Sequence, residues 1–241
     1  AKISEIKGDR VREALAEGMV VVVAGFQGVS TDKEITTLGR GGSDTTAVAL
    51  AAALNADVCE IYTDVTGIFT ADPRIVPQAR KLGRLQFEEM LEMAGSGSKV
   101  LALRSVEFAR NHNVPIHVRS SFTWEHGTWV SDEKSQGDSS MEEPIISGVV
   151  HDASESKVTI VGVPDKPGIS AALFESLANS NINVDMIVQN TSKDGLTDIS
   201  FTVPKADMKV AEDIVSRVSS EIGASGVTHN SEIAKVSLVG A

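Results

Sequence analysis

Runs of apolar residues in the first half of the chain predict a mixed α/β fold. The runs 20–24, ended by Gly25, and 58–62 each predict a strand that is buried on both faces. Between them, an alanine-rich stretch after Ser43 predicts a helix that stops near Asn55. The order strand, glycine loop, helix, strand is typical of a parallel or mixed sheet.

Weaker periodic patterns complete this half of the chain. Val11, Leu15 and Met19 recur at helical spacing in a charged segment, which predicts a surface helix in residues 1–19. By the same patterns we expect helices in residues 87–93 and 99–112 and a short strand in residues 115–118.

The pattern of the last third predicts a small, separate domain. We expect strands in residues 158–163, 184–189 and 199–203, a turn in residues 165–168 and helices in residues 171–178 and 210–222. The order βαββα, which needs one more strand, is that of a ferredoxin-like domain.

Two segments bear on the domain boundaries. The polar residues 131–143 lack a core-forming pattern and predict a connector, with a long surface loop inside one domain as the alternative. The sequence of residues 157–163 recurs in residues 235–241, at the end of the chain. This recurrence predicts the opening strand of a second small domain and hence a chain truncated at its C-terminus, although two apolar strands can also resemble each other by chance.

Composition and charge exclude several classes of protein. The net charge of −11 disfavours binding to nucleic acid and to anionic membranes, so any phosphate site must be built locally. The single cysteine, Cys59, excludes an intramolecular disulfide framework, and its apolar surroundings predict a buried, inert thiol. With no signal peptide or apolar run of membrane length, we expect a cytoplasmic protein.

The loop before the predicted alanine-rich helix is suited to binding an anion. Gly41, Gly42 and Ser43 let backbone N–H groups approach an anion at the positive end of a helix. Arg40 can hold a carboxylate or phosphate with two hydrogen bonds. Asp44 either caps the helix or orients a cationic group or the acceptor during phosphoryl transfer.

Other candidates are weaker when taken singly. Thr63 and Asp64 follow a buried strand, at the edge where open sheets bind ligands, but ordinary turns have the same composition. Arg74 lies in a turn-prone segment and can reach phosphates, and Lys99 is a cation at a glycine-rich helix entry. The five histidines lack metal-ligand spacing, so we expect no resident metal site.

Together these motifs resemble the aspartate kinase family, whose amino-acid-kinase domain is followed by ACT domains. The resemblance covers essentially the whole chain. The matching segments are residues 36–46, 63–68, 70–74, 87–90, 97–101, 114–121, 163–168, 181–186 and 189–190.

The resemblance implies an α/β protein with part of an amino-acid-kinase-type αβα sandwich, followed by a ferredoxin-like βαββαβ ACT domain. The implied organisation is a kinase part in residues 1–130, a connector in 131–154, an ACT domain in 155–234 and the start of a second ACT domain in 235–241.

The resemblance also implies an activity, the transfer of the γ-phosphoryl group of Mg²⁺-bound ATP to the β-carboxylate of L-aspartate. That reaction opens the route to lysine, diaminopimelate, threonine and methionine. The implied catalytic residues are Arg40 and Asp44, and the implied aspartate-binding residues are Arg40, Gly41, Gly42 and Ser43. The implied ATP-binding residues are Thr63, Asp64, Phe69, Thr70, Ala71, Asp72, Pro73, Arg74 and Lys99.

Regulation by threonine or lysine is implied as well, with oligomers formed by pairing of ACT domains. The implied effector-binding residues are Asp165, Lys166, Pro167, Gly168, Ile169, Ser170, Asn183, Val184, Asp185 and Gln189. The Pro-Gly turn opens a helix whose N–H groups suit an effector carboxylate, and either Asp165 or Asp185 can pair with the effector ammonium.

Two departures from the family pattern qualify the expected activity. The family's Lys-Phe/Tyr-Gly-Gly-Ser loop is missing, and Thr66 stands where an aspartate is usual. We therefore expect the isolated chain to be inactive. A non-catalytic amino-acid sensor is an alternative function; a kinase for glutamate or a nucleotide is another, which the ACT segment disfavours.

Overall fold

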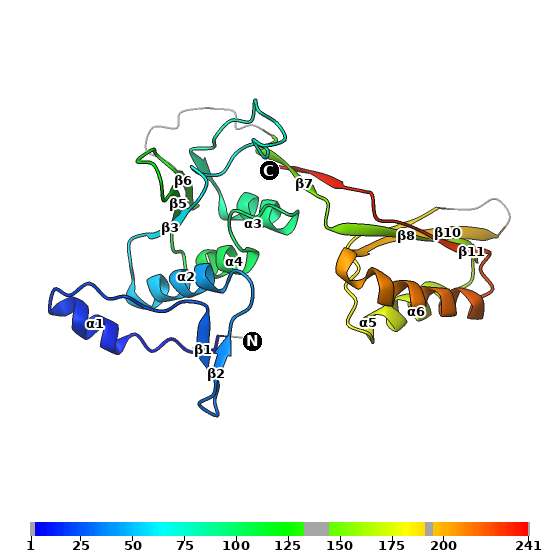
Figure 1. Cartoon of the computed structure of the whole chain (residues 1–241), viewed down its shortest axis with the longest axis horizontal. Coiled ribbons are helices and arrows are strands. Elements are labelled where there is room, and N and C mark those ends of the chain that lie inside the picture. The colour runs from blue at the N-terminus through cyan, green and yellow to red at the C-terminus, as the bar shows by residue number, and fades with distance from the viewer. Residues whose placement is uncertain (1–2, 133–144, 191–194, 241) are drawn as a thin grey trace. The chain divides into compact units, whose positions relative to one another are not determined.

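Two clusters of buried apolar side chains divide the chain into two units. The computed structural model describes residues 3–132, 145–190 and 195–240. Unit 1 comprises Ala1–His151 and Val236–Ala241, and unit 2 comprises Asp152–Lys235. Figure 1 traces the elements of both units.

A four-stranded mixed sheet is the centre of unit 1. In chain order up to residue 130, the elements of unit 1 are α1 (Asp9–Ala16), β1 (Gln27–Val29), β2 (Ile35–Thr37), α2 (Gly42–Leu54), β3 (Cys59–Thr63), β4 (Arg84–Leu85), α3 (Phe87–Gly95), α4 (Leu103–Asn111), β5 (Ile116–Ser120) and β6 (Thr128–Val130). The sheet order is β3-β5-β6-β4, with β3 parallel to β5, β6 antiparallel to β5 and β4 parallel to β6. Strands β1 and β2 form a separate hairpin.

Alternation along the strands places the core on one face of this sheet. Ile61, Val118 and Val130 are buried in the cluster that also contains side chains of α2, α3 and α4. The intervening Glu60 and Tyr62 point to the opposite face and are exposed. The helices α2 and α4 pack against each other, as Figure 1 shows. The predicted substrate residues 40–43 lie at the start of α2.

The predicted strand 20–24 is wrong. These residues form no strand, and Val20 and Val22 are each 92% exposed. An apolar run forms a buried strand only where a neighbouring strand pairs with its backbone N–H and C=O groups. No described strand pairs with residues 20–24. The helix predicted in residues 99–112 also begins later, at Leu103.

Unit 2 has the expected ferredoxin-like order. Its elements are β8 (Glu155–Pro164), α5 (Ile169–Ala178), β9 (Ile187–Gln189), β10 (Leu196–Pro204), a 3₁₀ turn (Lys205–Asp207), α6 (Met208–Glu221) and β11 (Gly226–Asn230). The antiparallel sheet has the order β11-β8-β10-β9, and its core includes Ile160, Leu173, Phe201 and Val215. Strand β11 is the additional strand that the predicted βαββα order required.

Strand β9 is shorter than predicted because Met186, just before it, does not pair regularly with β10. The hydroxyl of Thr202 accepts a hydrogen bond from the Met186 N–H at 3.2 Å, where a regular ladder uses a carbonyl. Regular pairing with β10 begins at Ile187. Among the described helices, none combines the length and apolarity needed to cross a bilayer.

A two-stranded ribbon marks both boundaries between the units. It consists of β7 (Gly148–Asp152) and β12 (Lys235–Val239), which pair with each other. Val150 and Val239 are buried in the core of unit 1. The ribbon thus includes part of the predicted connector, whose residues 133–144 lie outside the described residues. The assignment of residues 235–241 to a second ACT domain stays a prediction.

Candidate functional site

The start of α2 is formed by a glycine in the left-handed region. Gly41 has φ 70° and ψ 13° and is the N-cap residue, and α2 has no side-chain cap. The N–H of Gly42 donates to the Gly39 carbonyl at 3.0 Å, which closes the turn. The next amides of the helix have no acceptor within it, as expected at any helix start. The geometry therefore presents backbone donors beside Arg40, which is exposed.

Asp44 does not cap its own helix. Its carboxylate accepts a hydrogen bond from the backbone N–H of Ala102, which precedes α4. Burial raises the pKa of Asp44, and this hydrogen bond lowers the pKa in opposition. The carboxylate is half-buried and is held against a second helix start. A role of Asp44 in phosphoryl transfer stays a prediction.

The segment before α4 lies beside the predicted substrate loop. A Cβ atom added to Gly41 would lie 2.3 Å from the Cβ atom of Ala102. Lys99 lies three residues before Ala102, is exposed and is not helical, so its placement at a helix entry is wrong. The loop and this segment form the first group of predicted site residues that the fold brings together.

A second group lies at the carboxyl end of β3. Thr63 donates from its hydroxyl to the Asp64 carboxylate at 3.1 Å. Arg74 binds Asp72 with two hydrogen bonds, Nε to Oδ1 at 3.0 Å and Nη2 to Oδ2 at 2.7 Å. The hydrogen bond from the Arg74 side chain is the main reason why the pKa of Asp72 falls to about 2.

The cation of this second group, Arg74, is exposed and is paired with Asp72. Arg74 is 85% exposed at its side chain. Its pKa is raised, chiefly by Asp72 and to a smaller extent by the charge of Asp64. Within the described residues, no hydrogen bond or ion pair joins this group to Arg40, Asp44 or Lys99.

Side chains far away in the sequence support the second group, and the sequence alone did not point to them. Residues 68–82 form a hairpin with an isolated bridge between Phe69 and Lys81. Lys81 donates from Nζ to the Glu125 carboxylate at 3.0 Å and to the His126 carbonyl at 2.8 Å. The contacts span more than forty residues, so no local pattern predicts them.

The cysteine prediction is confirmed. Cys59 is a free, buried thiol. Burial raises its pKa to about 11, with a further contribution from the negative charge of Asp44. The thiol therefore stays protonated and is not a nucleophile at neutral pH.

The predicted effector residues are spread along the sheet of unit 2. Asp165 lies at one end, since its N–H donates to the carbonyl of Gly195, just before β10, whereas Gln189 pairs with Ile199 near the middle of β10. Asp185 lies at the other end, where its N–H donates to the Thr202 carbonyl at 3.3 Å. At about 3.3 Å per residue along β10, the separation from Asp165 is roughly 20 Å.

Each end of this sheet has its own electrostatic character. The helix α5 starts at Gly168, which has φ 93° and no side-chain cap, so the exposed turn 165–168 offers backbone donors. The Asp185 carboxylate forms an ion pair with Lys235. Glu155 is buried nearby, and this burial raises its pKa.

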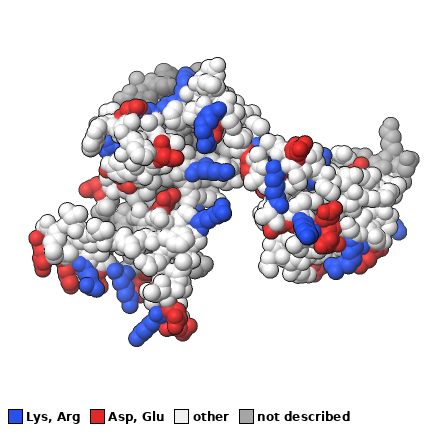
Figure 2. Space-filling view, viewed as in Figure 1, with Lys and Arg blue, Asp and Glu red and all other residues white. Residues whose placement is uncertain are grey.

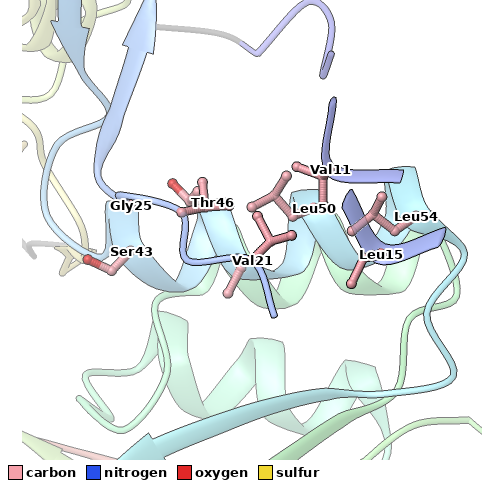
Figure 3. Close-up of a pocket in the computed structure, with 10 residues that line it drawn as sticks. Val11, Leu15, Val21, Gly25, Ser43, Thr46, Leu50 and Leu54 are labelled. Atoms are coloured by element: carbon pink, nitrogen blue, oxygen red, sulfur yellow. The ribbon is translucent and has the colours of Figure 1, made fainter. Parts of the chain in front are cut away.

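An apolar groove of about 440 Å³ lies between α1, the extended segment 21–25 and α2. In Figure 3, Val11 and Val21 lie nearest Leu50, and Leu15 lies nearest Leu54. Ser43 is at one end and, among the described residues, is the only predicted site residue in its lining. The described lining carries no charged side chain, so the groove is unsuited to a nucleotide.

On the face shown in Figure 2, acidic and basic side chains are interspersed between large uncharged areas. No group of three or more His, Cys, Asp or Glu side chains with the arrangement of a metal site occurs in the part of the chain that the structure describes.

Comparison with known proteins identifies matching families for both units. Residues 1–120 match the amino acid kinase family, and residues 158–218 match an ACT domain. Aspartokinase from Mycolicibacterium smegmatis is 59% identical over 244 residues, and aspartate kinase from Pseudomonas putida is 54% identical over 240. Both alignments cover 100% of this chain and 58% of the relative, so the chain spans little more than half the length of these relatives.

Solved structures agree with these matches. Aspartokinase III from E. coli, in complex with lysine and aspartate, is 30% identical with a TM-score of 0.74. The alignment covers 97% of this chain and 51% of that one. The same enzyme with aspartate and ADP is 29% identical with a TM-score of 0.73. The chain, with its amino-acid-kinase and ACT portions, belongs to the aspartokinase family.

Proposed function

We propose that this chain forms part of an aspartate kinase, which transfers the γ-phosphoryl group of Mg²⁺-bound ATP to the β-carboxylate of L-aspartate. The observation that carries the proposal is the start of α2, where a left-handed glycine, Arg40 and the half-buried Asp44 meet the segment before α4. The product is 4-phospho-L-aspartate. Family membership supports the same assignment.

On this proposal the start of α2 binds the acceptor. The amide of Ser43 and the guanidinium of Arg40 suit the carboxylates of aspartate, while Gly41 and Gly42 shape the turn that presents them. Asp44 orients the cationic groups that neutralise the transferred phosphoryl. Catalysis of this kind needs positioning and charge neutralisation rather than a covalent nucleophile, which agrees with a protonated, buried Cys59.

The nucleotide binds at Thr63, Asp64 and the segment Phe69–Arg74, and Lys99 contacts its phosphates. The Mg²⁺ ion arrives with the ATP. The pairing of Arg74 with Asp72 holds the guanidinium in a fixed orientation, although its exposed side still faces solvent. Binding of phosphates there requires Arg74 to share its donors between Asp72 and the nucleotide.

Feedback regulation through unit 2 is part of the proposal. Threonine or lysine is bound by the residues around Gly168, together with Asn183–Asp185 and Gln189. A free amino acid cannot contact Asp165 and Asp185 of one unit when they lie roughly 20 Å apart. Two units from different copies can complete one site, so the proposal includes pairing of ACT domains in an oligomer.

The ribbon of β7 and β12 supplies a route for this regulation. Within unit 1, the Val149 N–H donates to the carbonyl of Thr70, in the proposed nucleotide loop, at 2.7 Å. The Ser147 N–H donates to the Val239 carbonyl at 2.8 Å, and the Ser147 hydroxyl bonds to Glu89 in α3. A shift of the ribbon on effector binding therefore moves a backbone group of the nucleotide loop.

The decisive experiment is the trapping of acyl phosphate with hydroxylamine in the presence of Mg²⁺, ATP and L-aspartate. Calorimetry with L-aspartate and with a Mg²⁺-bound non-hydrolysable ATP analogue tests binding in a chain that does not turn over. Arg40→Gln should abolish aspartate binding, whereas Arg10→Gln, on the exposed surface of α1, should not. Equal aspartate affinity in both variants would contradict the proposal. The inactivity of the isolated chain stays a prediction that the same assay tests.

A non-catalytic amino-acid sensor is the second candidate. It is favoured by the complete βαββαβ order and separate core of unit 2. Calorimetry with threonine and lysine separates the two: effector heat without nucleotide binding favours the sensor. The biosynthetic routes and the cytoplasmic location stay predictions.

A further inference from the structure

Thr128 lies at the base of the hairpin that carries the proposed nucleotide loop. The residue begins β6 and has no exposed surface. The hairpin consists of residues 68–82 and connects the turn after β3 to the approach of β4. Sixty residues separate Ile68 from Thr128 in the chain.

The hydroxyl of Thr128 bonds to both arms of the hairpin. The Ile68 N–H donates to Thr128 Oγ1 at 2.8 Å, and Thr128 Oγ1 donates to the Leu82 carbonyl at 2.6 Å. Between the arms, the Leu82 N–H donates to the Ile68 carbonyl at 2.8 Å. A hydroxyl has one donor and two acceptor sites, so a single side chain satisfies one backbone group on each arm.

The hairpin extends from this base toward the residues of the nucleotide loop. Phe69 bridges to Lys81, and the Thr70 N–H donates to the Arg80 carbonyl at 2.9 Å. Below the base, a Cβ atom on Gly67 would lie 2.6 Å from Thr128 Oγ1, so the backbone abuts the threonine side chain. The point at which the loop leaves the sheet is therefore set by Thr128.

We propose that Thr128 is a positioning residue for nucleotide binding. Its hydroxyl holds the two arms so that residues 69–74 face the phosphates of ATP in one geometry. The inference rests on the proposed nucleotide role of that loop. Loss of the hydroxyl leaves the Ile68 N–H and the Leu82 carbonyl without their buried partner, which loosens the loop at its base.

The test compares two ligands and three variants of the intact chain. Thr128→Val removes the hydroxyl at nearly constant volume, Thr128→Ser keeps it, and Thr159→Val makes the same change in unit 2, where Thr159 bonds to Ser200 at 2.8 Å. Calorimetry measures the affinity for Mg²⁺-bound AMP-PNP and, separately, for L-aspartate.

The expected result is a split between the ligands. Thr128→Val should weaken AMP-PNP binding about tenfold, the loss expected from one or two buried hydrogen bonds, and leave aspartate binding within about twofold. Thr128→Ser and Thr159→Val should retain the nucleotide affinity of the unsubstituted chain. Unchanged nucleotide binding in Thr128→Val overturns the inference, and so does an equal loss of both ligands, which indicates a general structural defect.

A measurement on the unsubstituted chain covers the case in which Thr128→Val does not fold. AMP-PNP should slow hydrogen exchange of the Ile68 and Leu82 amides, since a nucleotide that uses this geometry stabilises the base of the hairpin. Binding without such protection contradicts the positioning role but not the proposed function. Failure of the unsubstituted chain to bind AMP-PNP overturns the nucleotide assignment and the inference with it.

Discussion

The helices α2 and α5 begin in the same way in different surroundings. Gly41 and Gly168 are both left-handed N-cap residues, with φ of 70° and 93°, and neither helix has a side-chain cap. A Cβ atom on Gly41 would lie 2.3 Å from the Cβ atom of Ala102, whereas a Cβ atom on Gly168 would meet nothing within 4 Å. Backbone conformation requires glycine at both positions, but packing requires it at only one.

The difference corresponds to the two proposed ligands. A substrate loop has to hold its donors in place before the reaction, and close packing against a second helix start provides this. An effector loop that is completed by another copy has to stay open on one side. The surroundings of each glycine therefore indicate whether the proposed ligand site at that helix start is completed by this chain or by another copy.

The largest effect is expected for Gly41→Ala. The substitution combines left-handed strain with overlap of two methyl groups, and we expect it to lower the free energy of unfolding of unit 1 by about 2–5 kcal/mol. Urea unfolding followed by tryptophan fluorescence measures this, because both tryptophans, Trp124 and Trp129, lie in unit 1. A loss below about 1 kcal/mol would show that the loop relaxes without cost.

A second substitution should restore part of this loss. Ala102→Gly removes the opposing methyl group, so Gly41→Ala/Ala102→Gly should recover about 1–3 kcal/mol and keep only the backbone strain. Ala102 is the N-cap residue of α4, where glycine is tolerated. Strict additivity of the two single substitutions in urea unfolding would argue against direct contact between these residues.

Gly168→Ala should have a smaller effect that is confined to unit 2. Only left-handed strain applies, so we expect a loss of about 1–2 kcal/mol. Hydrogen exchange of the α5 amides measures this loss, and the fluorescence transition of unit 1 serves as the internal control. An effect as large as that of Gly41→Ala would refute the distinction between a packed and an open helix start.

The smallest effect concerns pH at the packed start. The pKa of Asp44 in the folded chain is raised above its ordinary value of 3.8, so its contribution to stability is fully present below pH 3.8 and is lost as pH rises through the folded pKa. Asp44→Asn should remove this dependence, while the amide oxygen can still accept the hydrogen bond from Ala102. Urea midpoints across this pH range measure the slope, which solvent screening at the half-buried carboxyl keeps small. Identical slopes in both proteins would contradict the raised pKa.

Periodicity predicted the elements whose burial depends on their own residues. The alanine-rich helix α2, the strand around Ile61 and the order of unit 2 are confirmed, because each is apolar in the pattern that its neighbours require. The run 20–24 has the same composition as a buried strand but no paired neighbour among the described strands. Apolar character alone does not decide burial.

The sequence predicts the motifs of the candidate site but not the tertiary contacts that hold them in place. The loop before α2 carries glycines and charges that suggest anion binding without a structure. The contacts of Asp44 with Ala102 and of Thr128 with the hairpin join residues about sixty positions apart. Such contacts depend on the packing of the whole unit and leave no local pattern in the sequence.

The paired strands β7 and β12 have a consequence for how the protein can be divided. Because unit 2 leaves unit 1 through β7 and returns through β12, it is an insertion whose two ends are neighbours about 5 Å apart. Shortening the chain to any point before Val239 removes a buried side chain from the kinase core. We therefore expect a different domain with adjacent termini, joined at the same two junctions, to leave the core of unit 1 intact.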